Sequence, residues 1–197
     1  MPELPEVETM RRGVLPIVGH RILSAERPLC ERRPILFEPP IRNFHNRVRD
    51  RVIRQIDRLG KRVIIRLDDE QAIVIEPRMT GLVLLSDPPG TDHLRLRLNL
   101  DGRRYSQLLF WDRRGLGTVR LLSADQLRQQ DEARLGSDAL AITADQLRQV
   151  LGASRRVIKV ALLDQTVLAG IGNLYASEIL FVARISPKKS CHRLTRI

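Results

Sequence analysis

Met1-Pro2-Glu3-Leu4-Pro5-Glu6-Val7-Glu8 opens the chain and joins a candidate nucleophile to the start of a helix. Removal of the initiator methionine would leave Pro2 with a free secondary amine, and a terminal amine titrates near neutrality, with a reference pKa of about 7.7–8.0. Amine nucleophiles that form Schiff bases need acids nearby, and Glu3 and Glu6 are adjacent in sequence. The alternative is purely structural, because Pro5 suits a first helical turn and Glu6 and Glu8 suit its positive end.

The segment after Pro5 predicts one N-terminal helix that ends near Gly19. Four apolar residues recur there at helical spacing: Val7, Met10, Val14 and Val18. Residues 20–28 then begin a β-rich region, in which three prolines mark a loop between strands: Pro34, Pro39 and Pro40. Six later segments are predicted strands: Val52–Asp57, Arg62–Leu67, Ala72–Glu76, Leu82–Leu85, His93–Leu100 and Tyr105–Trp111.

The segment His93–Leu100 alternates strictly between apolar and polar residues. Its leucines lie on one face and Arg95, Arg97 and Asn99 on the other, so we expect one face to pack and the other to be wet and basic. Turns at Asp101-Gly102 and at residues 88–90 (Pro-Pro-Gly) suit hairpins. No helix-length insertion separates these strands, which predicts an antiparallel two-layer sandwich.

Beyond residue 121 the pattern changes to helices. Ser123-x-x-Gln126 and Thr143-x-x-Gln146 are typical of capping boxes, and the second is followed by apolar residues on one helical face: Leu147, Val150 and Leu151. Residues 155–164 and 173–183 predict two more helices, with apolar positions at Ile158, Ala161 and Leu162, and at Ala176, Ile179, Leu180 and Ala183. The predicted class is α+β, with an N-terminal β-sandwich domain over 1–121, a linker over 122–140 and a helical domain over 141–197.

Composition points to a polyanion as partner. The 197 residues carry a formal net charge of +11, and only four of the 34 basic residues are lysines. Arginine binds phosphate through a planar fork, and a positive field steers nucleic acid toward a protein. The chain shows no leader and no apolar run of about 18 residues, so neither secretion nor membrane spanning is predicted. The two distant cysteines, Cys30 and Cys191, fit a reduced cytoplasmic setting.

Residues 1–13 resemble the formamidopyrimidine-DNA glycosylase and endonuclease VIII family almost letter for letter, and members of that family begin Pro-Glu-Leu-Pro-Glu-Val-Glu after methionine removal. The resemblance implies a bifunctional DNA glycosylase and lyase that removes oxidised purines. It further implies that Pro2 attacks the sugar carbon C1′ and that Glu3 gives a proton to the departing base, with Glu6 beside them. Residues 58–67 also look like the family segment that carries a functional lysine. Lys61 is therefore expected to contact phosphate and to donate a proton during β-elimination.

Two further segments resemble family motifs with departures. Residues 76–81, Glu-Pro-Arg-Met-Thr-Gly, place Met79 where the family methionine fills the gap left by an extruded base, although the family's His-Leu-Gly is replaced by Glu-Pro-Arg. Residues 112–117 resemble the Asp-Pro-Arg-Arg-Phe-Gly loop. They put Arg114 at its first arginine, glycine at its second, and Leu116 at the aromatic wedge. His93 matches a family histidine more weakly.

The segment from Arg155 to residue 178 resembles the family's helix–two-turns–helix element. A Gly-x-Gly turn lets backbone N–H groups approach a phosphate at the start of the next helix. The resemblance implies that Arg155, Lys159, Gly172 and Asn173 bind DNA and that Tyr175 supports them, although Tyr175 also suits a core position.

One family part has no counterpart in this sequence. Family members continue into a zinc finger with four cysteines, and Cys191-His192 offers too few ligands to replace it, so no cofactor is predicted. The predicted partner is damaged double-stranded DNA, bound by a monomer in the cytoplasm near the nucleoid. Two alternatives stay open from the residues: a non-catalytic DNA-binding homologue, and an RNA binder suggested only by charge, with few aromatic platforms at 4%.

Overall fold

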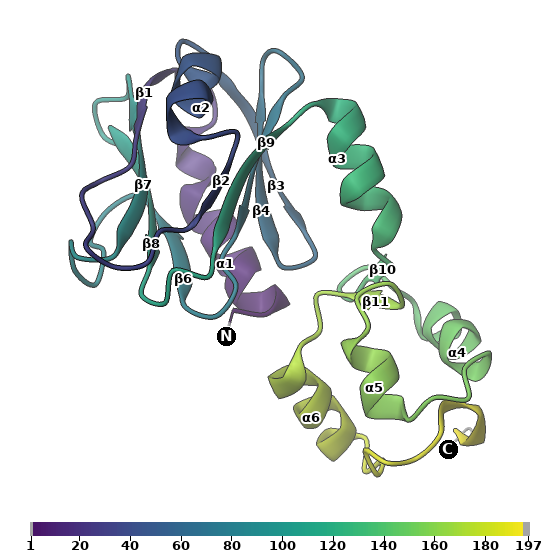
Figure 1. Ribbon diagram of the computed structural model, residues 1–197. Coiled ribbons are helices and arrows are strands. Elements are labelled where there is room, and N and C mark those ends of the chain that lie inside the picture. Colours follow the sequence, from purple (N-terminus) through teal and green to yellow (C-terminus); the bar gives the residue numbers. More distant parts are fainter. Residues whose placement is uncertain (1, 195–197) are drawn as a thin grey trace. The chain divides into compact units, whose positions relative to one another are not determined.

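Two β-sheets face each other in the N-terminal part of the computed structural model, which describes residues 2–194 (Figure 1). The four-stranded sheet has the order β1 (Ile22–Glu26), β7 (Leu94–Leu100), β8 (Gln107–Asp112) and β6 (Gly81–Leu84). The five-stranded sheet has the order β2 (Leu36–Glu38), β9 (Thr118–Leu122), β5 (Ala72–Glu76), β4 (Arg62–Leu67) and β3 (Ile53–Leu59). The predicted α+β class with a β-sandwich is confirmed.

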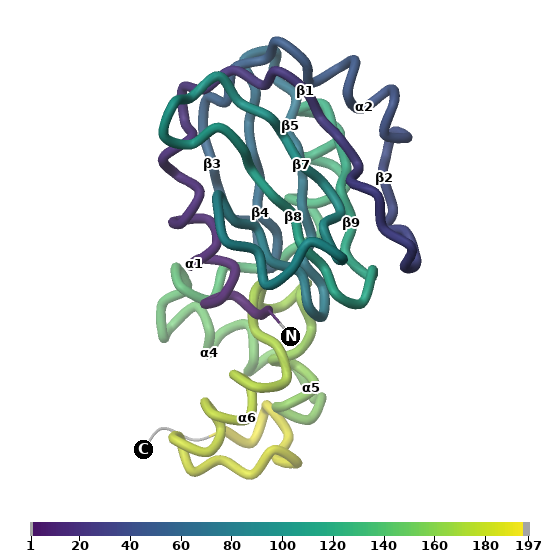
Figure 2. Tube along the Cα trace, turned by 90° about the vertical axis from the view of Figure 1, so that its left-hand side faces the viewer, coloured from purple at the N-terminus to yellow at the C-terminus, as the bar shows by residue number. Residues whose placement is uncertain are grey.

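Two helices close the open sides of this sandwich (Figure 2). Helix α1 (Leu4–Val14) packs against β6 and β3, which are the edge strands of the two sheets. Helix α2 (Ile41–Val48) packs against β1 and β2 at the opposite edges, where the Ala25 amide donates to His45 Nδ1 at 3.1 Å. Edge strands expose unpaired backbone groups, so covering them protects the sandwich from pairing with other chains.

The main core lies between the two sheets and is built from the alternate residues that point inward. Buried partners from the two sheets include Ile65 and Ile73 on one side and Leu96 and Phe110 on the other. The runs in β4 and β5 are apolar without alternation because their outer faces are also covered. There Ile64 and Val74 pack with Leu127 of α3 (Ala124–Gln130). A strand buried on both faces needs continuous hydrophobicity.

Several details of the sandwich differ from the expectations. Strand β2 pairs with β9 in parallel, so the five-stranded sheet is not purely antiparallel. The turn at residues 88–90 joins no hairpin, because β6 pairs with β8 and not with β7. The predicted turn at Asp101-Gly102 does connect paired strands, β7 and β8. Helix α2 and strands β2 and β9 were not predicted; they are short, with three to eight residues each, and give little periodic signal.

The predicted end of the first helix and the predicted exposure of the fifth strand are also wrong in part. Helix α1 ends at Val14 and a 3₁₀ turn, η1 (Leu15–Ile17), follows, because Pro16 has no N–H to continue an α-helix. On β7 the leucines are buried as expected, but the other face is not uniformly wet. Arg95 is only 3% exposed and donates to backbone carbonyls.

The chain divides after Arg128 into two compact units, a boundary that lies within residues 122–140. The second unit contains η2 (Glu132–Arg134), β10 (Ser137–Asp138) paired in parallel with β11 (Leu168–Ala169), α4 (Ala144–Gly152), α5 (Ile158–Leu163), α6 (Asn173–Val182) and η3 (Cys191–Arg193). Its core joins Leu151, Ile158, Leu162, Ala176 and Leu180. Both predicted capping boxes form, at Ser123 and at Thr143. Three positions predicted to be apolar contacts are instead exposed: Val150, Ile179 and Ala183.

Candidate active site and nucleic-acid interface

The start of α1 buries a carboxyl group beside Pro2. Glu3 is the N-cap residue and only 1% exposed, while Pro2 just before it is half-buried. Glu3 and Glu6 form a reciprocal capping box, in which the Glu3 amide donates to Glu6 Oε2 at 2.9 Å. Both acids therefore do serve to start the helix, as the structural alternative holds. An N-cap position does not require burial, however, and a buried acid at a candidate nucleophile is suited to proton transfer. Met1, and with it the processing of the terminus, lies outside the described residues.

A network around Glu8 anchors α1 to β3 and thereby fixes the terminus. The Glu8 carboxylate accepts from Arg11 at 2.8 Å, from Arg12 at 2.8 Å and from Arg58 of β3 at 3.2 Å. These bonds, led by the one from Arg11, lower the pKa of Glu8 from 4.5 to about 2. Glu8 was expected only to suit the positive end of the helix, and its pairing with Arg58 was not predicted. The spacing of Glu8 from Arg11 and Arg12 was the available signal.

Lys61 lies in the turn between β3 and β4 and is half-buried. Burial lowers its pKa, and the carboxylates of Glu3 and Glu76 act in the opposite direction. The fold therefore brings Lys61 near Glu3, 58 positions earlier in the sequence. Glu76, a departure from the family motif, joins this group. It also pairs with Arg62 at 3.4 Å and Arg78 at 3.2 Å. A lysine with a depressed pKa can donate a proton, whereas an arginine there could not.

Met79 lies in the turn between β5 and β6 and is 37% exposed. The residue before it, Arg78, adopts a positive φ of 57°. Glycine is the residue best suited to that conformation, which is consistent with the glycine that the family motif has at this position. Met79 is thus an apolar side chain held at the surface by a tight turn, and it is not part of the core.

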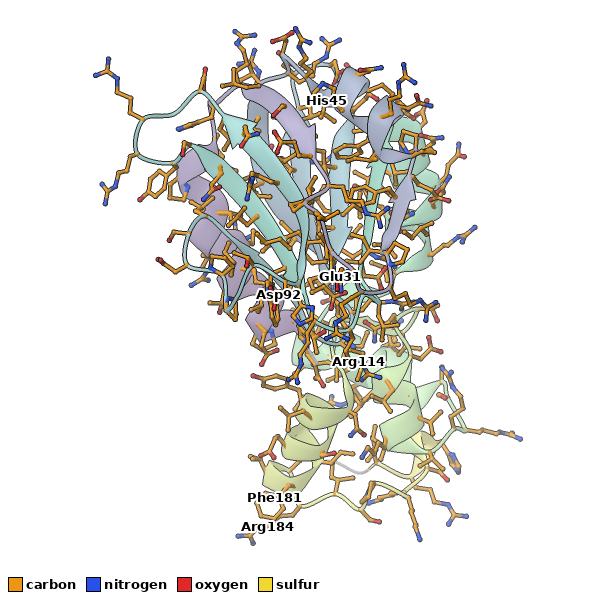
Figure 3. All side chains as sticks on the ribbon, turned by 60° about the vertical axis from the view of Figure 1, so that its left-hand side comes forward. Glu31, His45, Asp92, Arg114, Phe181 and Arg184 are labelled. Atoms are coloured by element: carbon orange, nitrogen blue, oxygen red, sulfur yellow. The ribbon has the colours of Figure 1, made fainter. Side chains whose placement is uncertain are left out.

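Arg114 and Leu116 lie in the turn between β8 and β9. Arg114 is exposed and Leu116 half-buried. Figure 3 shows Arg114 at the same end of the first unit as Asp92 and Glu31, far from His45 at the other end. The turn is organised by Asp112, which accepts from the amides of Arg114 at 3.2 Å and Gly117 at 2.8 Å. Asp112 was matched only to the first residue of the family loop, and its role in organising the turn was not predicted.

His93 precedes β7 and contacts the base of the same turn. Its carbonyl accepts from the Asp112 amide at 2.9 Å, and its ring packs edge-on against Trp111 with 5.5 Å between centroids. Among the described residues, His93 Nδ1 is buried without a hydrogen-bond partner. The structure thus places His93 near the Arg114 turn, with its ring against Trp111.

In the second unit, a short hydrogen-bond chain joins Lys159 of α5 to Asn173 of α6. The Lys159 ammonium donates to Ser177 Oγ at 2.9 Å, and the Ser177 hydroxyl donates to the Asn173 carbonyl at 2.8 Å. Ser177 was missed because serine within a helix carries no distinctive signal. The arrangement holds a cation beside the second turn of α6, near the N-terminal end at which the helix dipole favours an anion.

The turn between α5 and α6 is held by Gln165. Its side chain donates to the carbonyls of Leu163 and Ile171 and accepts from the Gly170 amide at 3.0 Å. Gly170 has a φ of 105° and Gly172 is the N-cap residue of α6. The Gly-x-Gly segment therefore forms the turn before α6, with Gly170 in a conformation that favours glycine and Gly172 at the helix start.

The remaining predicted residues divide between surface and core. Arg155 is exposed before α5, whereas Tyr175 packs against the core of the second unit. Cys191 is buried in that core, which raises the pKa of its thiol. Within residues 2–194, no group of three or more His, Cys, Asp or Glu side chains is placed to hold a metal ion, so the zinc that the resemblance implies has no donor set there. No helix in the same residues is long and apolar enough to cross a bilayer.

A β-sandwich with a buried acid at its N-terminus, followed by a helix–two-turns–helix element, defines a class of DNA glycosylases. The family model of the formamidopyrimidine-DNA glycosylase N-terminal domain matches residues 1–119, and that of the formamidopyrimidine-DNA glycosylase H2TH domain matches residues 135–197. The chain belongs to the formamidopyrimidine-DNA glycosylase family.

Individual relatives agree with this assignment. The chain is 40% identical to the formamidopyrimidine-DNA glycosylase of Thermomicrobium roseum, over 99% of this chain and 72% of the relative. It is 36% identical to the formamidopyrimidine-DNA glycosylase of Herpetosiphon aurantiacus, over 98% of this chain and 71% of the relative. Among solved structures it resembles MutM in complex with DNA containing carbocyclic 8-oxo-G, with a TM-score of 0.83, 32% identity, and coverage of 99% and 73%. It also resembles Lactococcus lactis Fpg with abasic-site DNA, with a TM-score of 0.82, 32% identity, and coverage of 98% and 71%. These relatives favour the enzyme over a non-catalytic homologue.

Proposed function

We propose that this chain excises oxidised purines, formamidopyrimidine and 8-oxoguanine, from double-stranded DNA and then cleaves the strand, with Pro2 as the nucleophile. The observation that carries the proposal is the buried carboxyl of Glu3 next to Pro2, within electrostatic reach of the half-buried Lys61. The solved relatives in complex with 8-oxo-G and abasic-site DNA support the substrate class.

The proposed chemistry divides one difficult step into easier ones. The Pro2 nitrogen lone pair attacks C1′, the glycosidic bond breaks, and its electron pair leaves with the base, which takes a proton from Glu3. The attacking nitrogen then loses its proton, the sugar ring opens as the C1′–O4′ bond breaks and O4′ takes a proton, and the iminium ion that results acidifies the C2′ proton. Loss of that proton forms a double bond and expels the 3′ phosphate, and Lys61 supplies a proton during this elimination.

Residues of the second unit bind phosphates in this proposal. Lys159 and Asn173, joined through Ser177, present a cation and the start of α6 to the DNA backbone. In the first unit, Met79 fills the gap left by the extruded nucleotide and Leu116 enters the neighbouring base step. Extrusion costs a few kcal/mol, which these contacts offset.

Borohydride trapping with a duplex that contains an abasic site tests the proposal. Reduction fixes the iminium as a covalent adduct, so the wild-type chain should shift in mass by the DNA fragment. Pro2→Gly should give no adduct at equal DNA occupancy. Binding without trapping would instead indicate a non-catalytic homologue, and mass spectrometry that finds the initiator methionine retained would contradict Pro2 as nucleophile.

We further propose that the chain acts as a monomer near the nucleoid and without a cofactor, because the nucleophile and proton donors are its own groups. Sedimentation at micromolar concentration should give one species of 22.6 kDa. Excision should be unchanged in a chelator.

A further inference from the structure

Asp112, the last residue of β8, has a fully buried carboxylate that binds two surface turns at once. One is the Met79 turn, residues 77–80, and the other is the Arg114 turn, residues 113–117. Oδ1 accepts from the Thr80 hydroxyl at 2.6 Å and from the Arg114 amide at 3.2 Å, and Oδ2 accepts from the Gly117 amide at 2.8 Å. Hydrogen bonds to an ionised acceptor are short and strong, so the two turns share one rigid centre.

Thr80 completes the connection between the two turns. Its hydroxyl donates to Asp112 and also accepts from the Arg114 amide at 3.0 Å. Three groups, the Thr80 hydroxyl, the Asp112 carboxylate and the Arg114 amide, therefore close a small ring of hydrogen bonds. The position of Met79 relative to Leu116 depends on this ring, because each is a near neighbour of one of its members.

Arg95 anchors the backbone of Asp112 through a buried hydrogen bond. Its Nε donates to the Asp112 carbonyl at 2.8 Å, and one terminal nitrogen donates to the Arg33 carbonyl at 2.9 Å. The turn is also tightly packed at Gly115, where an added Cβ would lie 2.6 Å from the Arg33 carbonyl oxygen. The Arg114 turn is thus fixed to the sandwich, and the Thr80 hydroxyl ties the Met79 turn to it.

We propose that Thr80 and Asp112 are positioning residues that hold Met79 and Leu116 in one geometry, so that gap filling and wedge insertion occur together at one base step. This inference rests on the proposed function of the two apolar side chains. Displacement of a reacting or inserting group by about 1 Å can cost on the order of a hundredfold in rate, which is the effect that such a centre prevents.

Thr80→Val tests the proposal because it removes the hydroxyl and keeps the shape. Loss of a bond to a charged acceptor should lower single-turnover excision of 8-oxoguanine opposite cytosine about 10- to 100-fold. Thr80→Ser keeps the hydroxyl and should stay within about threefold of wild type. Trapping on a preformed abasic duplex needs no base extrusion, so Thr80→Val should lower it much less than it lowers excision.

Thr118→Val is the matched control, since Thr118 Oγ1 is buried without a hydrogen-bond partner among the described residues. This variant should excise at the wild-type rate. Asp112→Asn is a second probe, because an amide cannot accept at all the positions that the carboxylate fills. It should lower excision at least as far as Thr80→Val. Equal losses of excision and trapping in Thr80→Val, or wild-type excision by it, would overturn the proposal.

Hydrogen exchange on the free protein separates this inference from the proposed function. In Thr80→Val the Arg114 amide should exchange faster, and in Thr118→Val it should not. If the wild-type chain neither excises nor traps, the proposed function fails, and the exchange rates still decide whether Thr80 ties the turns together. An unchanged exchange rate of the Arg114 amide in Thr80→Val would contradict the proposal that Thr80 links the two turns.

Discussion

Arg58 of β3 donates from Nε to the Glu8 carboxylate of α1 at 3.2 Å, and its side chain is only 9% exposed. This bond joins the helix that follows Pro2 to the strand that leads into Lys61. The geometry of the proposed active site therefore depends on an ion pair that takes no part in the chemistry.

Glu8→Gln should destabilise the first unit by about 1–2 kcal/mol at neutral pH, less than the full pKa difference implies because Arg12 is exposed. The folded-state pKa is lowered to about 2 from 4.5, so this stability is present above pH 4.5 and is lost as the pH falls through 2. Urea unfolding followed by the fluorescence of Trp111, the only tryptophan, measures it.

The difference between wild type and Glu8→Gln should thus shrink with acid and vanish near pH 2. Asp145→Asn is the control, because Asp145 is 90% exposed and pairs with Arg148 on the surface of α4. It should leave the Trp111 transition unchanged. A Glu8→Gln effect that is the same at pH 3 and pH 7 would show that packing, and not ionisation, is responsible.

Lys61→Arg should slow strand cleavage on the order of a hundredfold while it preserves the positive charge, because arginine does not give up its proton. Burial lowers the pKa of Lys61, and an acid must be protonated to act. Wild-type cleavage should therefore decline as the pH rises through this lowered pKa, and Lys61→Arg should lack that decline. Quenched-flow measurement of product over a pH series checks both the cleavage rate and its decline with pH. Lys188→Arg, the same substitution at an exposed lysine, is the control. Full activity in Lys61→Arg would leave Lys61 with a purely electrostatic role.

Gly115→Ala should destabilise the first unit by about 1–3 kcal/mol and weaken binding to DNA. Gly115 has a φ of 63°, and a Cβ there would lie 2.6 Å from a backbone oxygen. Gly13→Ala is matched to it, since a Cβ at Gly13 in α1 meets nothing within 4 Å. That change should stabilise by about 0.5–1 kcal/mol. The changes in the free energy of unfolding, followed by Trp111 fluorescence, should have opposite signs in the two variants. An unchanged free energy of unfolding in Gly115→Ala would mean that the turn can adjust its backbone to accommodate a Cβ.

Lys159→Gln should weaken binding to duplex DNA by a similar factor for damaged and undamaged sequences. Loss of one phosphate contact should reduce the slope of log K against log salt concentration by about 0.9. Fluorescence anisotropy from low to moderate salt measures the slope. Lys188→Gln, which removes an exposed charge outside the Ser177 network, reports the effect of net charge alone. Equal slopes for the two variants would remove Lys159 from the interface.

Those parts of the protein that depend on local interactions could be predicted from the amino-acid sequence alone. Helical spacing in residues 5–14, alternation in β7 and the capping box at Thr143 are settled by neighbours a few residues apart, so their patterns can be recognised without a fold. The N-terminal motif and the Gly-x-Gly turn likewise identified the family, because their residue types and order are the signal.

The contacts between distant segments became apparent only in the folded structure. Pairing of β6 with β8 in place of β7, burial of Arg95, and the approach of Glu3 to Lys61 and Glu76 all follow from how the two sheets close on each other. The ring formed by Thr80, Asp112 and Arg114 is of the same kind, since 32 positions separate its first two members. Such contacts depend on strand order and register, which long-range packing sets and local sequence periodicity does not encode.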